Sequence, residues 1–371
     1  MHILLAPDKF RGSLTARQVC DAMREGIALA APEATTTALP LADGGEGTAQ
    51  LLTEATNGQW HYRTVSGPLD KPVQAGFGLS GDGRTAYVEL AQASGLSLLK
   101  KTEQNPLQTT TAGTGQLMRM AVEQGATTVV LCLGGSATND GGVGMAEALG
   151  WQFRNASGTS FRPTGGTLHR IHTIAPPERP LPVSVRVACD VQNPLCGPAG
   201  ASVVYGPQKG ASPADVAALD DGLQHLAKLV SDQLHSDYGN VPGAGAAGGT
   251  GFGAMTFLNA TLEPGVDLVL DVIRFDEHLR RASLLLTGEG KLDEQTLQGK
   301  LLAGVCRRAA EYHVPVVALC GTLTLMPGQI QQLGLAAAFS ILNAPQTLQT
   351  AFSGAYDDLR RATFNVMRLL R

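Results

Sequence analysis

The sequence predicts an α/β protein in which both ends of the chain form one parallel-sheet domain and the middle forms a second, inserted α/β domain. At both ends, short apolar runs alternate with segments of helical periodicity, the pattern of parallel strands joined by helices. In the middle the segments are shorter and glycine-rich breaks separate them. The 371 residues suit two domains of roughly 150 residues each.

The beginning of the chain predicts two strand–helix units. Residues 3–6 are an apolar run that ends at Pro7, as expected of a buried parallel strand. Thr15 and Gln18 resemble a capping box, and apolar residues follow at helical spacing. Residues 36–41 predict the second strand, and Thr48 opens the next helix.

The C-terminal third repeats this pattern. Residues 283–287 predict a buried strand, followed by a glycine-containing loop at residues 288–290 and a helix that includes Leu301 and Val305. Residues 314–319 predict the next strand. Apolar residues from Phe352 to Leu369 recur every three or four positions, which predicts a final helix with one face packed on the core.

We expect the chain to pass between the domains near residues 65–69, a segment that contains Gly67 and Pro68. The first domain would then comprise residues 1–64 and 283–371, and the inserted domain residues 65–282. We expect the active site in the cleft between these two domains.

Composition excludes several classes of protein. The chain has 28 Lys and Arg against 32 Asp and Glu, and this net charge of −4 argues against a nucleic-acid partner. A hydrophobic content of 43% excludes a disordered chain. The N-terminal apolar run is too short for a signal peptide, and the uncharged stretch at 240–262 holds too many glycines for a membrane span. The six cysteines show no metal-finger spacing, so we expect free thiols and a cytoplasmic protein.

Standard nucleotide-binding motifs are absent or incomplete. A P-loop is excluded because Gly290-Lys291 and Gly299-Lys300 are each followed by leucine. The segment at 243–248 matches GxGxxG, but no apolar strand precedes it and the acidic residue of a dinucleotide site is missing. We expect a flexible or ligand-closing glycine loop there instead.

A recurring pattern carries the chemistry: an apolar strand, then a loop that combines glycine with charged residues. These loops lie at residues 8–13, 43–47, 134–142, 189–195, 205–210 and 287–293. In open α/β sheets, ligands bind beyond the carboxyl ends of the strands, where such loops lie. Their backbone N–H groups can bind phosphate, their carboxylates can hold Mg²⁺ or accept a proton, and their cations can neutralise a transferring phosphoryl group.

Each loop also has a purely structural interpretation. Asp8 could cap a turn, and Asp43 could be a favourable acid at a helix N-terminus. Residues 134–142 could form a tight strand-to-helix turn, Asp190 an Asx turn, and Lys209 a surface charge. Because six such loops occur in one chain, a purely structural role does not explain all of them well.

Taken together, these loops resemble the type-1 glycerate kinase (glycerate 2-kinase) family over essentially the whole chain. The resemblance is carried by the strings APDKFRGSL at 6–14, ADGGEGT at 42–48, GGSATNDGG at 134–142, ACDV at 188–191, GPQKGA at 206–211, PGAGAAGG at 242–249 and TGEGKLD at 287–293. Many members carry Lys where Arg11 stands and Arg where Lys291 stands. Both exchanges keep the charge but change the donor geometry, so substrate preference could differ.

The resemblance implies an ATP- and Mg²⁺-dependent kinase that phosphorylates D-glycerate at its 2-hydroxyl group. It also implies a flavodoxin-like domain with an inserted second domain, a small-molecule partner rather than nucleic acid or membrane, and a role in glyoxylate or sugar-acid metabolism. The strictness for glycerate and the oligomeric state, a homo-oligomer included, stay open.

The loops lead us to expect particular residue roles. The expected catalytic residues are Asp293, Asp190 and Lys209, with Asp293 favoured over Asp190 as the proton acceptor. Glycerate would be bound by Asp8, Lys9, Arg11, Ser13 and Lys291. ATP phosphates would be bound by Gly134, Gly135, Ser136, Thr138 and Asn139 in one loop and by Gly243, Gly245 and Gly248 in another. The expected metal ligands are Asp43, Asp190 and Glu289.

Two other functions remain open at this stage. The chain could be a hydroxyacid-binding protein without catalysis, although charged groups in all six loops weigh against this. It could also be a dinucleotide-dependent dehydrogenase that uses the glycine loop at 243–248, although the sequence around that loop weighs against it.

Overall fold

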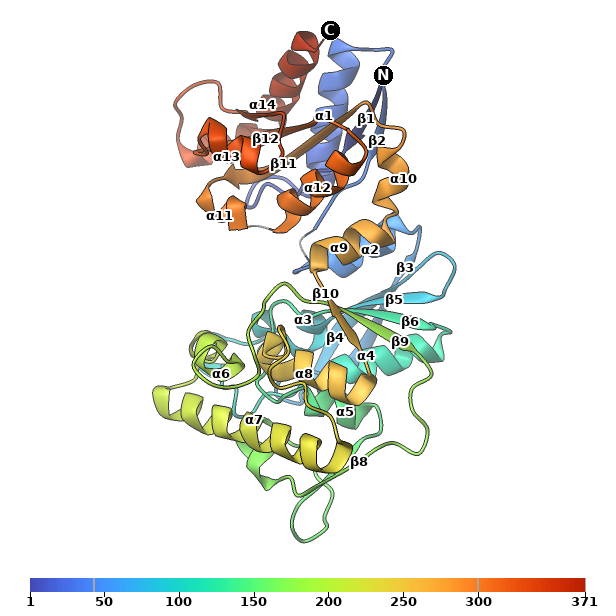
Figure 1. The fold of residues 1–371 in the computed structure, drawn as a ribbon, viewed down its shortest axis with the longest axis vertical. Helices are drawn as coiled ribbons and strands as arrows, with labels where there is room; N and C mark the ends of the chain where they lie inside the picture. The colour runs from blue at the N-terminus through green and yellow to red at the C-terminus, as the bar shows by residue number, and fades with distance from the viewer. Residues whose placement is uncertain (43, 299, 371) are drawn as a thin grey trace. The chain divides into compact units, whose positions relative to one another are not determined.

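The computed structural model of this chain describes residues 1–42, 44–298 and 300–370. The chain forms two compact units, coloured by residue number in Figure 1. Unit 1 consists of Met1–Asp43 and Val266–Arg371, and unit 2, inserted between them, of Gly44–Gly265. These boundaries differ from the expected ones near residues 64 and 282.

Five strands in the described part of unit 1 form one parallel sheet. They are β1 (His2–Leu5), β2 (Thr35–Ala38), β11 (Leu284–Leu292), β12 (Val316–Leu323) and β13 (Ala337–Ser340). Their order is β2-β1-β11-β12-β13, which is the flavodoxin-like order 2-1-3-4-5. The strand order reverses between β1 and β11, and doubly wound sheets bind ligands at this switch point.

Helices cover both faces of the unit 1 sheet. α1 (Ala16–Ala30) and α14 (Leu348–Leu369) lie side by side on the face that carries Ile3, Leu5 and Leu286. α1 begins with the expected capping box, because the Thr15 hydroxyl accepts a hydrogen bond from the backbone N–H of Gln18. The other helices of unit 1 are α9 (Gly265–Val272), α10 (Phe275–Leu279), α11 (Glu294–Gln298), α12 (Lys300–Glu311) and α13 (Pro327–Gln332).

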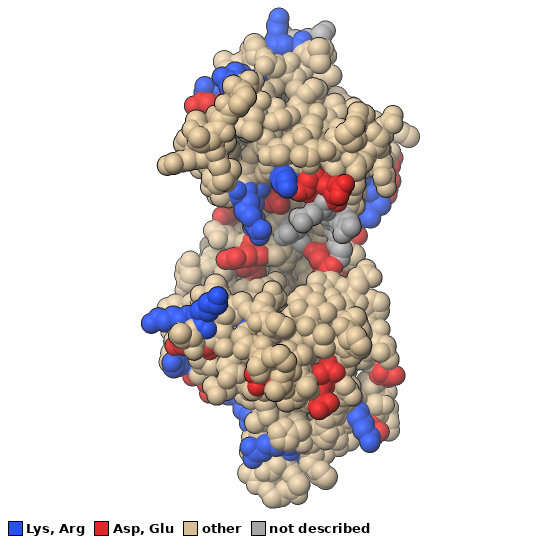
Figure 2. Space-filling view, turned by 90° about the vertical axis from the view of Figure 1, so that its left-hand side faces the viewer, with Lys and Arg blue, Asp and Glu red and all other residues tan. Residues whose placement is uncertain are grey.

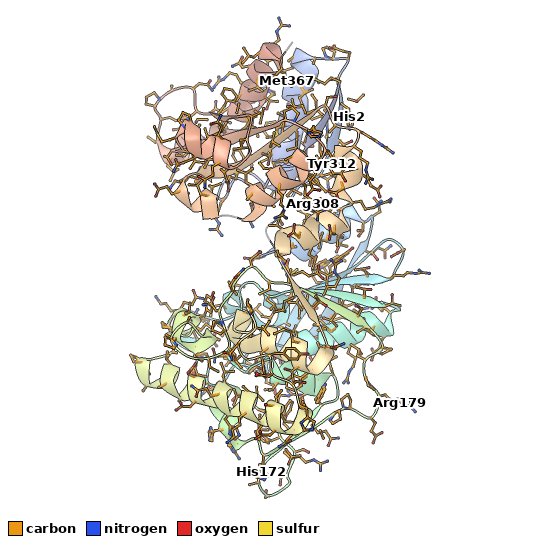
Figure 3. All side chains as sticks on the ribbon, viewed as in Figure 1. His2, His172, Arg179, Arg308, Tyr312 and Met367 are labelled. Carbon is orange, nitrogen blue, oxygen red and sulfur yellow. The ribbon has the colours of Figure 1, made fainter. Side chains whose placement is uncertain are left out.

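Arg308 explains why the second segment of unit 1 begins at Val266 and not near residue 283 (Figure 3). Its guanidinium group on α12 lies 2.6 Å from Asp271 on α9 and 2.9 Å from Asp276 on α10. These ion pairs join α9 and α10 to unit 1, although both helices precede residue 283.

Unit 2 contains a six-stranded mixed sheet. Its strands are β3 (Gln59–Ser66), β4 (Pro72–Leu79), β5 (Thr85–Glu89), β6 (Thr128–Cys132), β9 (Ser184–Ala188) and β10 (Thr261–Glu263), in the order β10-β9-β6-β5-β4-β3. β5, β6, β9 and β10 are parallel, and β3 and β4 form an antiparallel hairpin. The segment at 65–69 therefore covers the end of β3 and the start of the hairpin turn, and it lies within unit 2. β7 (Gln152–Arg154) and β8 (Thr173–Ala175) form a separate ribbon.

Helices pack around this second sheet in layers. α4 (Ala112–Glu123), α5 (Val143–Ala148) and α8 (Ala246–Leu258) share one apolar core with the sheet, and α7 (Pro213–Leu234) packs beyond them through Leu223 and Leu226. α2 (Thr48–Ala55) lies on the opposite face, where Thr53 contacts Gly78. The short helices are α3 (Leu90–Ser94), α6 (Ala201–Tyr205) and 3₁₀ turns at Leu96–Leu98, Lys101–Glu103, Gly165–Arg170 and Pro207–Lys209.

Two expectations for the C-terminal third need correction. β11 extends through residues 288–290, which were expected to form a loop, because Glu289 pairs with Cys320 and Lys291 with Thr322 on β12. The two ends of the expected apolar stripe on α14 are solvent-exposed, at 41% for Phe352 and 76% for Leu369.

The surface view shows small groups of both charge signs and no extended basic area on the visible face (Figure 2). Within the described part of the chain, no helix combines the length and the apolar character needed to cross a bilayer.

Candidate active site

Several loops of unit 2 meet at the carboxyl edge of its parallel strands. A Cβ atom placed on Gly134, after β6, would lie 3.2 Å from the Cα of Gly45. A Cβ atom on Gly44 would lie 3.2 Å from Oδ2 of Asp190, which follows β9. Three of the motifs singled out in the sequence are therefore direct neighbours in space.

Asp140 organises the loop at 134–142. Its fully buried carboxylate accepts hydrogen bonds from the backbone N–H and the hydroxyl of Thr111, both at 2.8 Å, and from the N–H groups of Gly142 and Gly144. Burial raises the pKa of Asp140, and these hydrogen bonds oppose that shift. The loop is thus a tight strand-to-helix turn, fixed where α5 begins.

Lys209 is buried against the same loop. Its side chain is only 2% exposed, so the interpretation as a surface charge is wrong. Its Nζ atom donates hydrogen bonds to Oγ of Ser136 at 2.8 Å and to the carbonyl oxygen of Thr138 at 2.7 Å. Burial lowers the pKa of Lys209 to about 7, and the nearby Asp140 carboxylate opposes this shift.

The polar side chains of this loop point into the protein. Thr138 and Asn139 are fully buried, and the amide of Asn139 donates to Oγ of Ser202 at 3.0 Å. Ser136 is almost completely buried beside Lys209. Gly134 is half-buried and Gly135 exposed, so the backbone at these two glycines is the part of the loop that a phosphate group can reach.

The glycine-rich segment at 243–249 packs against neighbouring loops. Gly248 has φ +67°, and a Cβ atom there would lie 2.0 Å from the carbonyl oxygen of Thr138. The N–H of Gly141 donates to the carbonyl oxygen of Gly248 at 3.0 Å. Gly243 and Gly245 are buried in the same way, against Cys189 and Pro194 respectively. Helix α7 and a loop, and not a strand, lie immediately before this segment, so the dinucleotide hypothesis loses its structural basis.

Asp190 lies half-buried at the end of β9. Its Oδ1 atom accepts a hydrogen bond from the backbone N–H of Gly265, at the start of α9, at 3.1 Å. Gly44 and Gly265 lie next to each other there, because a Cβ atom on Gly44 would be 3.0 Å from the Cα of Gly265. Asp43, the neighbouring candidate metal ligand, lies outside the described residues.

Glu89 is a buried carboxylate that the sequence analysis missed. It is the last residue of β5, is 3% exposed, and accepts a hydrogen bond from the N–H of Ala49 at 2.9 Å. Burial raises its pKa, and hydrogen bonds from the backbone of Ala49 and Gly47 oppose the shift. The available signal was an acidic residue directly after the apolar run at 86–88, but no glycine accompanied it.

A second group of candidates lies at the switch point of unit 1. Asp8 follows β1, and its N–H donates to the carbonyl oxygen of Gly288 on β11 at 2.9 Å. Burial raises the pKa of Glu289 to about 7; the negative charges of Asp8 and Asp293 add to this, and a hydrogen bond from Thr296 opposes it. The Oε1 atom of Glu289 is buried and finds no hydrogen-bond partner among the described residues. Asp8 and Glu289 also line a cavity of about 20 Å³, room for one water molecule.

Lys291 and Asp293 form an ion pair beside this carboxylate cluster. Nζ of Lys291 lies 2.6 Å from Oδ2 of Asp293, with Lys291 largely exposed and Asp293 largely covered. The N–H of Asp293 donates to the hydroxyl of Thr296 at 3.1 Å. Asp293 is therefore held in one orientation at the end of β11.

The loop after β1 supplies further cations. Lys9 and Arg11 are exposed, whereas the Ser13 hydroxyl donates to the carbonyl oxygen of Phe10 at 3.1 Å. This hydroxyl closes its own turn, so its expected contact with glycerate would require that bond to be shared. The candidates thus form two groups, one in each unit.

The carboxylates suit a magnesium ion by their donor chemistry. Mg²⁺ prefers oxygen ligands and is often bound by one or two carboxylates together with substrate phosphates. Asp190 and Glu289 supply such oxygens, and Oε1 of Glu289 has no hydrogen-bond partner in the part of the chain that the structure describes. Among the described residues, no three His, Cys, Asp or Glu side chains form a preassembled metal site.

The sequence profile of the glycerate kinase family matches residues 3–371. The chain belongs to the glycerate kinase family. Glycerate 2-kinase of Escherichia coli K12 is 44% identical over 373 residues, with coverage of 100% of this chain and 98% of that protein. Glycerate kinase of Bacillus subtilis 168 is 43% identical, with coverage of 99% and 97%.

A solved structure gives the same result for the fold. The crystal structure described as that of a glycerate kinase 2 from Salmonella typhimurium LT2 matches with a TM-score of 0.91 and 41% identity, covering 100% of this chain and 98% of that chain. The predicted family, the α/β fold class and the small-molecule kinase activity are thereby confirmed.

Proposed function

We propose that this protein transfers the γ-phosphoryl group of ATP, in the presence of Mg²⁺, to the 2-hydroxyl group of D-glycerate. The observation that carries the proposal is the 44% identity, over the whole chain, to a protein named glycerate 2-kinase. The two groups of charged loops are consistent with phosphoryl transfer, which depends mainly on positioning and on charge stabilisation.

In this proposal the switch point of unit 1 binds glycerate. The substrate is a small anion with two hydroxyl groups, and the loop after β1 offers the exposed cations Lys9 and Arg11. Lys291 adds a third positive charge from β11. Asp8, at the end of β1, would accept a hydrogen bond from a substrate hydroxyl group.

We assign the role of proton acceptor to Asp293. Its carboxylate is oriented by Lys291, and an oriented carboxylate within reach of the substrate can accept the hydroxyl proton as the oxygen attacks phosphorus. Asp190 in unit 2 is the second candidate for this role.

The loop at 134–142 would bind the phosphate groups of ATP through the backbone at Gly134 and Gly135. Lys209 and Asp140 hold the loop in one shape before the substrate arrives, and such preorganised donors are the effective ones in catalysis. Gly243, Gly245 and Gly248 would act indirectly, by packing that keeps this loop in place.

Asp190 in unit 2 and Glu289 in unit 1 would each offer carboxylate oxygens to a Mg²⁺ ion, and Asp43, outside the described residues, stays a proposed ligand. The bound ion would neutralise part of the charge on the phosphate groups. Substrate binding and proton transfer are assigned to side chains and backbone groups of the protein.

A coupled assay of ADP release tests this function. We expect release that depends on D-glycerate and on Mg²⁺. Binding of D-glycerate by calorimetry without any turnover would instead support the hydroxyacid-binding alternative.

A further inference from the structure

The first turn of α2 is capped from a distant strand. The residue before the helix is Gly47, with φ +92°, and it has no side chain that could cap the N-terminal amides. The carboxylate of Glu89, at the end of β5, accepts the hydrogen bond from the N–H of Ala49 instead. Glu89 thus replaces the N-cap side chain, usually Ser, Thr, Asp or Asn, as the acceptor for an amide of the first helical turn.

We propose that Glu89 is a positioning residue of the active site, which fixes the start of α2 and thereby the loop at 44–47 in front of it. This loop contacts the other two loops of the unit 2 edge. Its Gly45 lies against Gly134, and its Gly44 lies against the carboxylate of Asp190. A displacement of the start of α2 would therefore change the packing around Gly134 and around the Asp190 carboxylate.

The segment that follows Glu89 binds the phosphate-loop candidate directly. The N–H of Leu96 donates to the carbonyl oxygen of Gly135 at 2.8 Å, and the N–H of Ala137 donates to the carbonyl oxygen of Ser94 at 2.9 Å. Glu89 stands where this segment leaves β5, so it links the loop at 44–47 to the loop at 134–142. Its side chain is buried and bonded to the backbone of α2, as suits a residue that acts by positioning the loops.

Three variants separate the hydrogen bond from the charge. Glu89→Gln keeps an acceptor oxygen at the same length, Glu89→Asp keeps the charge but is too short to reach Ala49, and Glu89→Ala removes both. Val185→Ala is the matched control, because Val185 is a buried core residue near the start of β9, away from the carboxyl edge. If Glu89→Ala does not fold, Glu89→Asp tests whether the hydrogen bond to α2 positions the loop at 44–47.

Amide hydrogen exchange at residues 45–52 and steady-state kinetics are the two measurements. In Glu89→Ala and Glu89→Asp we expect exchange at the start of α2 to rise about 10-fold or more, since the amides of Ala49 and Gly47 lose their acceptor. We expect kcat/KM for D-glycerate to fall about 100-fold through misplacement of the loops. Glu89→Gln keeps one acceptor oxygen but replaces the other with an amide donor, so it should lose less than Glu89→Ala in both measurements. Val185→Ala should lose stability without either change.

Wild-type exchange rates in Glu89→Asp would overturn the proposal. An equal loss of kcat/KM in a Val185→Ala variant of the same melting temperature would also overturn it, because the effect would then be one of stability alone. The kinetic arm rests on the proposed function, whereas the exchange arm does not. A wild-type protein without turnover of D-glycerate would therefore count against the function and leave the role of Glu89 to the exchange data.

Discussion

The Nζ atom of Lys209 lies 2.7 Å from the carbonyl oxygen of Thr138, in the middle of the loop that we propose binds ATP phosphates. A second hydrogen bond runs from the same atom to Ser136. A buried lysine amine thus holds the backbone of this loop, and its two bonds need only the two hydrogens of a neutral amine.

Lys209 gives the protein a specific dependence of stability on pH. Its pKa is about 7 in the folded protein and 10.5 is its ordinary value, so between these values the unfolded chain binds more protons. The free energy of unfolding of the wild type should therefore rise with pH in this window, relative to Lys209→Met, by about 1 kcal/mol per pH unit. Below pH 7 the difference should be flat.

Denaturant unfolding at pH 6, 7, 8 and 9 measures this difference, with the exposed Lys228→Met on α7 as control. A difference between wild type and Lys209→Met that is constant from pH 7 to 9 would contradict the buried, perturbed lysine.

Gly248 should tolerate no side chain. In Gly248→Ala the new Cβ atom would lie 2.0 Å from Thr138 and the residue would keep a positive φ, so we expect a loss of about 3 kcal/mol or more and a distorted phosphate loop. Gly158→Ala is the matched control, because Gly158 also has a positive φ, +81°, but no atom within 4 Å of its Cβ position. Equal melting temperatures for the two variants would show that close packing at Gly248 is unimportant.

Glu289 should make the folded state less stable as the pH rises. Its pKa is about 7 in the folded protein against 4.5 ordinarily, so between these values the folded state binds more protons and loses stability with increasing pH. Glu289→Gln removes this term. The variant should therefore gain stability over the wild type between pH 5 and 7, whereas Glu311→Gln, at an exposed position of the same unit, should not. A gain that does not change with pH would argue against the raised pKa.

Asp293→Asn tests the proton acceptor. If Asp293 accepts the substrate proton in the transition state, the variant should lose about 10²–10⁴-fold in kcat and a similar factor in kcat/KM. Lys291→Met removes the orienting cation and one of the proposed glycerate-binding charges, so it should lose less in kcat and raise KM. Near-normal kcat in Asp293→Asn with a large loss in Asp190→Asn would transfer the role to Asp190.

The local parts of the fold could be predicted because their signals are local. The capping box at Thr15 and the short buried strands at both ends depend on adjacent residues, and both are present. The length of β11 could not be predicted, because Gly288 and Gly290 disfavour a strand and only pairing with β12 extends it.

The candidate site shows the same division. Strand-end loops indicated where charged residues gather, as at Asp8 and Asp293. The burial of Lys209 depends on Ser136 and Thr138, which are far away in the sequence. Glu89 acts through α2, about 40 residues earlier in the chain, a relationship that no local pattern reveals.

The most direct test of the central claim is phosphorus NMR of the product formed from D-glycerate, ATP and Mg²⁺. The proposal predicts that 2-phosphoglycerate and ADP appear together in equal amounts, and that neither forms without glycerate. A 3-phosphate product would contradict the assigned hydroxyl group. If folded protein produced no phosphorylated glycerate at all, the proposed function itself would be contradicted.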